Sequence, residues 1–348
     1  MFSHKHYVPV LKGKRAEFPA VGSLKSKANV TPLFEAVPSS APEEIPRRMS
    51  AIWENDSPYY VDFFFLDDPD DTADPVPGTY PLLRCFAEVA AKGQNAIPVT
   101  GLSRSQTYQL AIAQITSEQG NGVGVRLVPD DFEDVEVLED SLGALRDFLT
   151  LKPEAIDLFL DVGSVFGSTA PVVAQLHRAN LELLPDLQRW RGLTVVASAF
   201  PLSLAPLVRN EWNPVSRNDW RGWRLLVAGP RRPPRLPGYG DYTIAHPQLP
   251  PEGRATILAQ LRYATEDSWL IWKGYNVFTH PIGYNQFLGI CSNLVARPEY
   301  RGASFSEGDN EIYEKATTGG SSGNAESRRR IGTNHHLETV LGQIANLP

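Results

Sequence analysis

The feature that most constrains the fold is an alternation of strand-like and helix-like segments over about 200 residues. Near-continuous apolar strands that alternate with helices are typical of a parallel sheet covered by helices. The first strand is expected in the stretch that opens at Tyr7. Further strands are expected at 30–37, 59–66, 96–100, 122–128, 156–161 and 193–200, and helices at 15–27, 47–55, 81–92, 105–118, 137–151 and 170–190.

An eighth strand is harder to place. We expect it at Gly240 to Ile244, while Ile257 to Tyr263 and Trp269 to Lys273 compete for the position and together resemble a β-hairpin. The remaining expected elements are a strand-like insert at 220–230 and helices at 284–295 and 336–345.

Eight strand–helix units in about 250 residues fit a (β/α)8 barrel. A doubly wound open sheet is the alternative, but it usually carries a glycine-rich phosphate turn after its first strand, where this chain has KGKRAE. We therefore predict an α/β fold, a (β/α)8 TIM-like barrel with a C-terminal β-hairpin and helical elaboration. It forms a single domain, with the barrel in residues 1–250 and the elaboration in 251–348 packed on it.

Composition indicates a globular protein, because 42% of the 348 residues are hydrophobic and 21% are charged. The net charge of -7 argues against nucleic-acid binding driven by the overall charge of the protein. A local basic surface could still exist on an acidic protein. Cys85 and Cys291 lie in apolar helical patterns and are expected to be reduced, which suits a cytoplasmic location. No signal peptide and no membrane-spanning run is expected.

Two lysines follow the first strand, one residue apart. Side chains alternate along a strand, so Lys12 and Lys14 are expected on the same face as Val8 and Val10. Unpaired charge is costly to bury. These lysines must therefore reach solvent, carboxylates or an anion.

Polar residues also stand at the ends of the other strands, and the site of a (β/α)8 barrel lies where its strands end. In the sixth strand, Asp157, Phe159 and Asp161 share a face. In the fifth strand, Gly124 and Arg126 share a face. The residues expected at this mouth are Lys12, Lys14, Glu35, Asp62, Thr100, Ser103, Arg126, Asp161, Ser198 and Asp241.

Two interpretations of the charged mouth are open. It could be a salt-bridged plug, although buried ion pairs stabilise poorly compared with apolar packing. Alternatively, the cations hold an anionic group, a nucleotide or other phosphate-bearing ligand, while a carboxylate acts as acid or base. The carboxylates could also hold Mg²⁺. On the second view the ligand-binding residues are Lys12, Lys14 and Arg126, and the catalytic candidates are Glu35, Asp62 and Asp161.

The C-terminal region adds further candidates. Asn334 reads as the N-cap of the last helix, and His335 or His336 after it could join the mouth as acid, base or ligand. The pattern predicts that Arg328 to Arg330 form a solvated basic turn, which could also bind the phosphate backbone of a nucleic acid. Spacings that suit core packing are found for Trp220, Trp223, Trp269 and Trp272.

Seven motifs run through nearly the whole chain: YVPVLKGKRAE, VTPLFE, YYVD, GDYTIAHP, LRYATEDSWLIWKG, FSEGDNEI and GTNHHL. Together they resemble the beta protein family of bacteriophages and bacterial phage-defence loci. The resemblance implies a role in phage and host conflict beside a toxic or regulatory partner, as an immunity or antitoxin component. It matches Lys12, Lys14, Glu35, Asp62, Arg262, Asp309 and His335 as pattern positions, without catalytic roles.

We therefore predict a defence-associated barrel protein that binds a phosphate-bearing ligand at its mouth, with hydrolysis left open. The alternative is a non-catalytic interaction protein that controls a toxin or nuclease partner, and a direct nucleic-acid binder is a third hypothesis. Further ligand-binding candidates are Arg262, Asp241 and His335.

Overall fold

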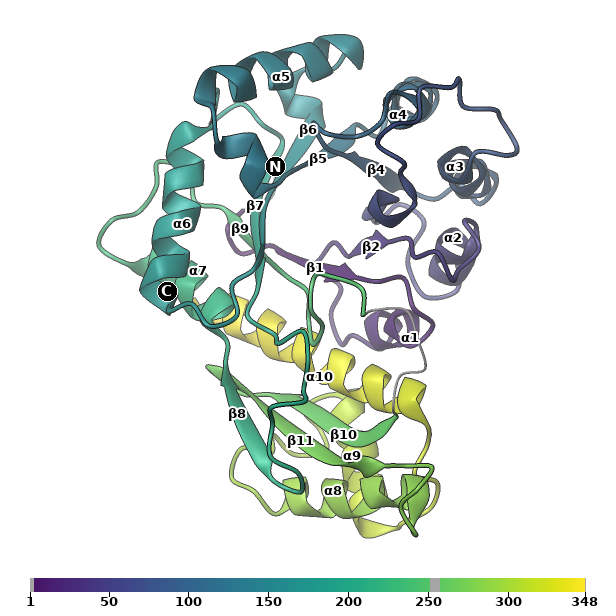
Figure 1. Ribbon diagram of the computed structural model, residues 1–348, viewed down its shortest axis with the longest axis vertical. Coiled ribbons are helices and arrows are strands. Elements are labelled where there is room, and N and C mark those ends of the chain that lie inside the picture. The colour runs from purple at the N-terminus through teal and green to yellow at the C-terminus, as the bar shows by residue number, and fades with distance from the viewer. Residues whose placement is uncertain (1–2, 251–256, 348) are drawn as a thin grey trace.

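The computed structural model describes residues 3–250 and 257–347. Its larger part is a closed barrel of parallel strands in the order β1-β2-β3-β4-β5-β6-β7-β9 (Figure 1). The predicted (β/α)8 barrel is confirmed. The strands are β1 (Tyr7–Leu11), β2 (Leu33–Glu35), β3 (Tyr59–Asp62), β4 (Ala96–Thr100), β5 (Val123–Leu127), β6 (Ile156–Ser164), β7 (Gly192–Ser198) and β9 (Gly238–Asp241).

Helices cover the outside of the barrel (Figure 1). The segment 220–230 was expected to be strand-like, but it is helical up to Ala228. Trp220, Trp223 and Val227 are buried at the three- and four-residue spacing of one helix face. The helices are α1 (Glu17–Gly22), α2 (Glu44–Met49), α3 (Pro81–Ala91), α4 (Gln106–Gln119), α5 (Val135–Phe148), α6 (Ala170–Leu183) and α7 (Asn218–Ala228), with short 3-10 turns η1 (Phe64–Leu66), η2 (Pro129–Phe132) and η3 (Pro153–Ala155).

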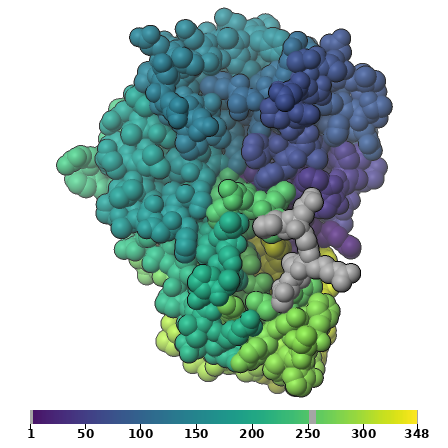
Figure 2. All heavy atoms as spheres, viewed as in Figure 1, coloured from purple at the N-terminus to yellow at the C-terminus, as the bar shows by residue number. Residues whose placement is uncertain are grey.

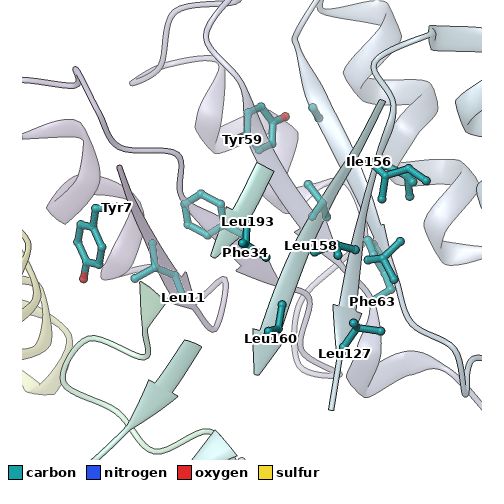
Figure 3. Packing of buried hydrophobic residues seen from close by; sticks show 14 of the residues in the cluster. Tyr7, Leu11, Phe34, Tyr59, Phe63, Leu127, Ile156, Leu158, Leu160 and Leu193 are labelled. Atoms are coloured by element: carbon teal, nitrogen blue, oxygen red, sulfur yellow. The ribbon is translucent and has the colours of Figure 1, made fainter. Parts of the chain in front are cut away.

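The side chains of β1 alternate between the two faces of the barrel wall. Val8 and Val10 pack inside the barrel with Tyr60 and other inward residues. Tyr7 and Leu11 belong to the larger core cluster between strands and helices (Figure 3). The predicted faces of the first strand are therefore confirmed.

A smaller part, which we call the C-terminal lobe, is built on an antiparallel sheet in the order β10-β11-β8. The predicted hairpin is present, as β10 (Leu258–Ala264) and β11 (Ser268–Asn276). The third strand, β8 (Trp212–Ser216), was not predicted, because WNPVS carries a proline and polar residues, a composition tolerated at a sheet edge. Helices α8 (Gln286–Val295) and α9 (Glu307–Thr317) and the turn η4 (Gly283–Asn285) complete the lobe.

A long helix, α10 (Ala325–Ala345), lies between the barrel and the C-terminal lobe (Figure 1). The expected start at His336 is wrong, because Asn324 caps the helix by accepting from the Ser327 amide at 2.9 Å. The expected cap, Asn334, is internal and donates to the Ala20 carbonyl at 3.0 Å. Residues 328–330, expected to form a turn, lie in the first turns of α10.

Figure 2 shows the larger mass of the barrel and the smaller mass of the C-terminal lobe packed together. Cys85 in α3 and Cys291 in α8 are buried and not bonded to each other. Among the helices of residues 3–250 and 257–347, none is long and apolar enough to cross a membrane.

Candidate functional site

The predicted charges meet at the C-terminal end of the barrel around Arg126. Its guanidinium donates to Glu35 Oε1 at 2.8 Å and to Asp62 Oδ2 at 2.9 Å. It also donates to Asp161 Oδ2 at 2.7 Å and contacts the hydroxyl of Tyr242. Burial would lower the pKa of Arg126, but Tyr242 and the three carboxylates raise it well above its usual value. Arg126 therefore stays charged. It contacts four side chains, each from the end of a different barrel strand or from the residue that follows it.

Two further cations complete this site. Lys12 donates to Glu35 Oε2 at 2.5 Å and also to the Pro247 carbonyl. Arg104, in the loop after β4, donates to Asp62 Oδ1 at 3.1 Å. We call the whole set the mouth cluster; its members are Lys12, Glu35, Asp62, Arg104, Arg126, Asp161 and Tyr242.

The mouth cluster is buried and balanced in charge, with three cations facing three carboxylates. Glu35 and Asp62 are both 0% exposed. The ring of Phe65 in η1 contacts the cluster at Lys12, whose Nζ lies 4.5 Å from the ring centre. This geometry agrees with the plug interpretation, and a catalytic role for the carboxylates stays a hypothesis.

A guanidinium, and not an open set of oxygens, lies at the centre of the mouth cluster. Across the described ranges, no group of three or more His, Cys, Asp or Glu side chains is arranged to hold a metal ion. Mg²⁺ at the mouth would have to replace Arg126 as the partner of Glu35 and Asp62. Mg²⁺ binding stays an untested prediction.

Lys14 and Arg262 lie beside the mouth cluster and are not part of it. The chain turns at Gly13, where φ is +61°, so Lys14 does not continue the line of Lys12. Arg262 reaches from β10 and donates to the Ile244 carbonyl at 2.5 Å. Both side chains line a cavity of about 170 Å³, the rim pocket, together with Lys12, His246 and Arg329.

A second cavity, of about 480 Å³, shares Lys14, Arg262 and Arg329 with the rim pocket. We call it the basic groove, because the described residues that line it include five cations and one carboxylate. It lies between the loop that joins β1 to α1 on the barrel side, β10 in the C-terminal lobe and the start of α10. The lining residues are Lys14, Arg15, Ala16, Ser39, Ser40, Ile244, Ile257, Leu258, Gln260, Arg262, Ala325, Glu326, Arg328 and Arg329.

The cations shared by the two cavities repel one another. Burial lowers the pKa of Lys14, and the charge of Arg329 lowers it further. Burial and Arg329 also lower the pKa of Arg262 to about 9. An acid, Glu17, lies 3.6 Å from Arg329, and burial raises the pKa of its carboxyl group. A bound anion would relieve this repulsion, so the shared wall favours negative charge.

Asp241 does not lie at the mouth, contrary to the prediction. Successive residues of a strand alternate, so Tyr242 points into the barrel and Asp241 points outward. There it accepts from the Tyr7 hydroxyl at 2.6 Å and lies 2.7 Å from His336 Nε2. Burial would raise the pKa of Asp241, but His336 and the hydrogen bonds lower it.

His335 is also remote from the mouth, because it lies in the middle of α10. Its Nδ1 is 2.7 Å from Asp309 Oδ2, and its Nε2 is 2.7 Å from the Ala264 carbonyl. Tyr263 stacks on the imidazole at 3.7 Å and donates to Asp309 at 2.8 Å. His335 thus fastens α10 to the C-terminal lobe.

Adjacent histidines therefore hold α10 from two sides, His336 to the barrel and His335 to the lobe. Their partners Asp241, Tyr263 and Asp309 come from the segments GDYTIAHP, LRYATEDSW and FSEGDNEI. Four of the motifs singled out in the sequence thus meet at α10, in two hydrogen-bonded groups centred on His336 and His335.

Sequence reasoning missed Arg104 and Tyr242. Arg104 follows β4 by a few residues, so its position after a strand end was an available signal, but the prediction named Thr100 and Ser103 instead. Thr100 donates to Gln109 at 3.0 Å and is not in the mouth cluster. Ser198 likewise donates elsewhere, to the Ala245 carbonyl at 3.1 Å.

The fold and the network define the class: a (β/α)8 barrel whose antiparallel C-terminal lobe is fastened by a helix bearing paired histidines. Within that class, the chain belongs to the beta protein family, whose model, described as Beta protein, matches residues 7–342. No curated protein matches the sequence. The resemblance seen in the motifs is therefore confirmed over nearly the whole chain.

Proposed function

We propose that the chain binds a phosphate-bearing ligand, with nucleotides as the leading class, at the wall shared by the rim pocket and the basic groove. The observation that supports this most is charge: among the described residues, five cations and one carboxylate line the groove of a chain whose net charge is -7. An ammonium group and a guanidinium fork both suit phosphate oxygens. The groove, at about 480 Å³, has the size of a small-molecule site.

On this proposal Lys14 and Arg262 contact the phosphate, and Lys12 supports it from the mouth side. Hydrolysis would require a mouth carboxylate to leave Arg126 and act as acid or base, so catalysis is a separate hypothesis. A setting in phage defence, which the resemblance implies, belongs to the proposal as its biological context.

Calorimetric titration with adenosine monophosphate tests the proposal. Lys14→Ala and Arg262→Gln are each expected to weaken binding about tenfold, because each removes a charged phosphate contact. Matched controls are Lys152→Ala and Arg189→Gln, which remove exposed cations near the opposite end of the barrel. The proposal fails if the folded wild-type chain does not bind, or if the controls weaken binding as much as the groove variants do.

A second candidate is a non-catalytic protein that controls a toxin or nuclease partner. The observation that favours it lies on the loops around the mouth, where Phe64, Phe166 and Leu202 are 46%, 57% and 51% exposed. These loops follow β3, β6 and β7, and the balanced mouth cluster between them needs no ligand to satisfy its charges. Large exposed apolar side chains are common at protein interfaces.

Co-purification separates the two candidates. The interaction hypothesis predicts that a protein encoded beside this chain co-purifies with it, and that Phe166→Asp with Leu202→Asp abolishes the association. The double variant Lys12→Ala with Asp161→Ala, checked for folding, is expected to leave phage protection intact under this hypothesis. Loss of protection by that folded variant would favour a function at the mouth.

A further inference from the structure

A segment of the C-terminal lobe combines exposed rings with a lack of charge. Residues 274–296 contain no Asp, Glu, Lys or Arg, although 21% of the whole chain is charged. Clusters of exposed apolar side chains mark binding surfaces on globular proteins. We call the exposed and half-buried side chains at the start of this segment the aromatic edge; its members are Tyr275, Phe278, His280, Ile282 and Tyr284. Phe278 is the most exposed of them, at 69%.

The aromatic edge is continuous with the basic groove. The Val277 amide, directly before Phe278, donates at 3.0 Å to the carbonyl of Ile257, which lines the groove. The ring centres of Phe278 and Tyr284 are 6.1 Å apart. The Tyr284 ring in turn lies 5.1 Å from the guanidinium of Arg328, another lining residue. A ligand that leaves the groove at its lobe end therefore meets the aromatic edge.

The rings of the aromatic edge have the geometry of a stacking platform. The planes of Phe278 and Tyr284 meet at 86°, so this contact covers at most one face of the Phe278 ring. Tyr275 stacks on His280 at 5.2 Å, and exposed Arg209 lies 5.5 Å from the Tyr275 ring as a further cation. Planar bases stack on such rings without regard to sequence.

Rings beside a basic cavity favour a single-stranded nucleic acid over a lipid surface. Single strands are bound by a basic channel that follows the phosphates and by aromatic side chains on which the bases stack. A bilayer presents its phosphates on a broad surface, whereas Lys14 and Arg262 line a cavity. Its volume of about 480 Å³ suits a small molecule, so a longer strand must continue across the rim.

We infer that the ligand of the basic groove is a single-stranded nucleic acid, with one phosphate at Lys14 and Arg262 and a base further along the strand stacked on Phe278. This inference rests on the proposed function, because it takes the phosphate site as given. It names the substrate class of that site and adds the aromatic edge to it.

The test is calorimetric titration of adenosine monophosphate and of three strands of about 12 nucleotides into the full chain. Two strands are DNA and RNA of the same sequence, and the third is an abasic strand with the same number of phosphates. The wild type is expected to bind the DNA or the RNA strand at least about tenfold more tightly than the abasic strand, because only the bases can stack.

Substitutions of Phe278 assign the stacking contact. Phe278→Ala is expected to weaken the preferred strand about tenfold and to leave the monophosphate within about twofold. Phe278→Trp keeps a flat ring and is expected to retain strand binding. Phe148→Ala is the matched control, because Phe148 is also exposed but lies in α5, at the opposite end of the molecule from the C-terminal lobe (Figure 1).

The outcomes separate the inference from the proposed function. If the abasic strand binds as tightly as the others, or if Phe278→Ala acts no more strongly than Phe148→Ala, base stacking is refuted and monophosphate binding keeps the proposed function. If Phe278→Ala weakens the monophosphate as much as the strand, Phe278 belongs to the nucleotide site and the inference is refuted. If no probe binds, both fail. Association with a neighbouring gene's protein that Phe278→Ala abolishes, without strand binding, would also overturn the inference.

Discussion

Arg126 is the residue on which the end of the barrel depends. Replacing it by Met removes the cation and leaves Glu35, Asp62 and Asp161 buried beside one another. We expect Arg126→Met to lower the free energy of unfolding by about 3–5 kcal/mol, as for other buried pairs that lose one partner. Urea unfolding followed by circular dichroism measures the change.

The control for this prediction is Arg126→Lys, which keeps the charge but cannot donate to all three carboxylates. It should cost less than the Met variant. A loss below about 1 kcal/mol for Arg126→Met would show that the mouth cluster relaxes or takes up protons easily. Such a result would also support the hypothesis that these carboxylates act as acid or base.

Asp219, at the start of α7, is a buried acid whose carboxyl group is only partly hydrogen-bonded. It is 1% exposed, and its Oδ2 has no hydrogen-bond partner. Burial and the nearby Asp241 raise its pKa from 3.8 to about 7. The folded state therefore binds this proton more tightly than the unfolded state does. The free energy of unfolding should fall as the pH rises from about 4 to 7, because over this range the unfolded state loses the proton while the folded state keeps it.

Asp219→Asn isolates this effect, because the amide does not titrate. The shift from 3.8 to about 7 corresponds to a cost on the order of 4 kcal/mol once Asp219 is ionised. The variant should therefore gain stability relative to the wild type at pH 8 and lose that gain at pH 4.5. Thermal unfolding at both pH values measures it, and a difference that does not depend on pH would contradict the assignment.

At the scale of elements, α10 determines how the C-terminal lobe sits on the barrel. Gly332 faces β10, and a Cβ there would lie 2.8 Å from the Arg262 carbonyl and 3.0 Å from Ile244 Cδ1. Gly342, in the same helix, has no atom within 4 Å of an added Cβ. Substitution of Gly342 by alanine therefore changes helix propensity alone, whereas the same substitution at Gly332 also changes packing.

We expect Gly342→Ala to stabilise the protein by up to about 1 kcal/mol, through helix propensity alone. Gly332→Ala should instead destabilise it by about 1–3 kcal/mol, because overpacking against the Arg262 carbonyl outweighs propensity. Chemical unfolding of both variants gives the comparison. Equal effects at the two positions would mean that α10 does not pack closely against β10.

The barrel elements could be predicted because their apolar runs repeat with clear spacing, and the inward faces of β1, β5 and β6 followed from alternation alone. The register of the C-terminal part could not be predicted in the same way. The polar residues Asn334, His335 and His336 resemble a helix start, yet they lie inside α10, where neighbouring elements supply their hydrogen bonds. Such long-range partners leave no signal in local spacing.

The candidate site was predictable to a similar extent. Lys12, Glu35, Asp62, Arg126 and Asp161 could be placed together, because parallel strands end at one edge of a barrel. The basic groove could not, because it arises where β1, β10 and α10 meet. Arg262 and Arg328 are separated by dozens of residues, and only the packing of the lobe brings them to one cavity.

The whole molecule combines an acidic chain, a neutral barrel mouth and a basic groove between barrel and lobe. The mouth cluster neutralises its own charges. In the groove, burial and neighbouring cations lower the pKa values of Lys14 and Arg262. This difference in charge balance is the reason why the proposal places ligand binding at the groove and not at the mouth.

An experimental structure of the chain with saturating adenosine monophosphate tests this claim most directly. The account predicts density for the phosphate within hydrogen-bond distance of Lys14 Nζ and the Arg262 guanidinium. An empty wall at a concentration that saturates binding in solution, or a nucleotide bound elsewhere, would contradict it.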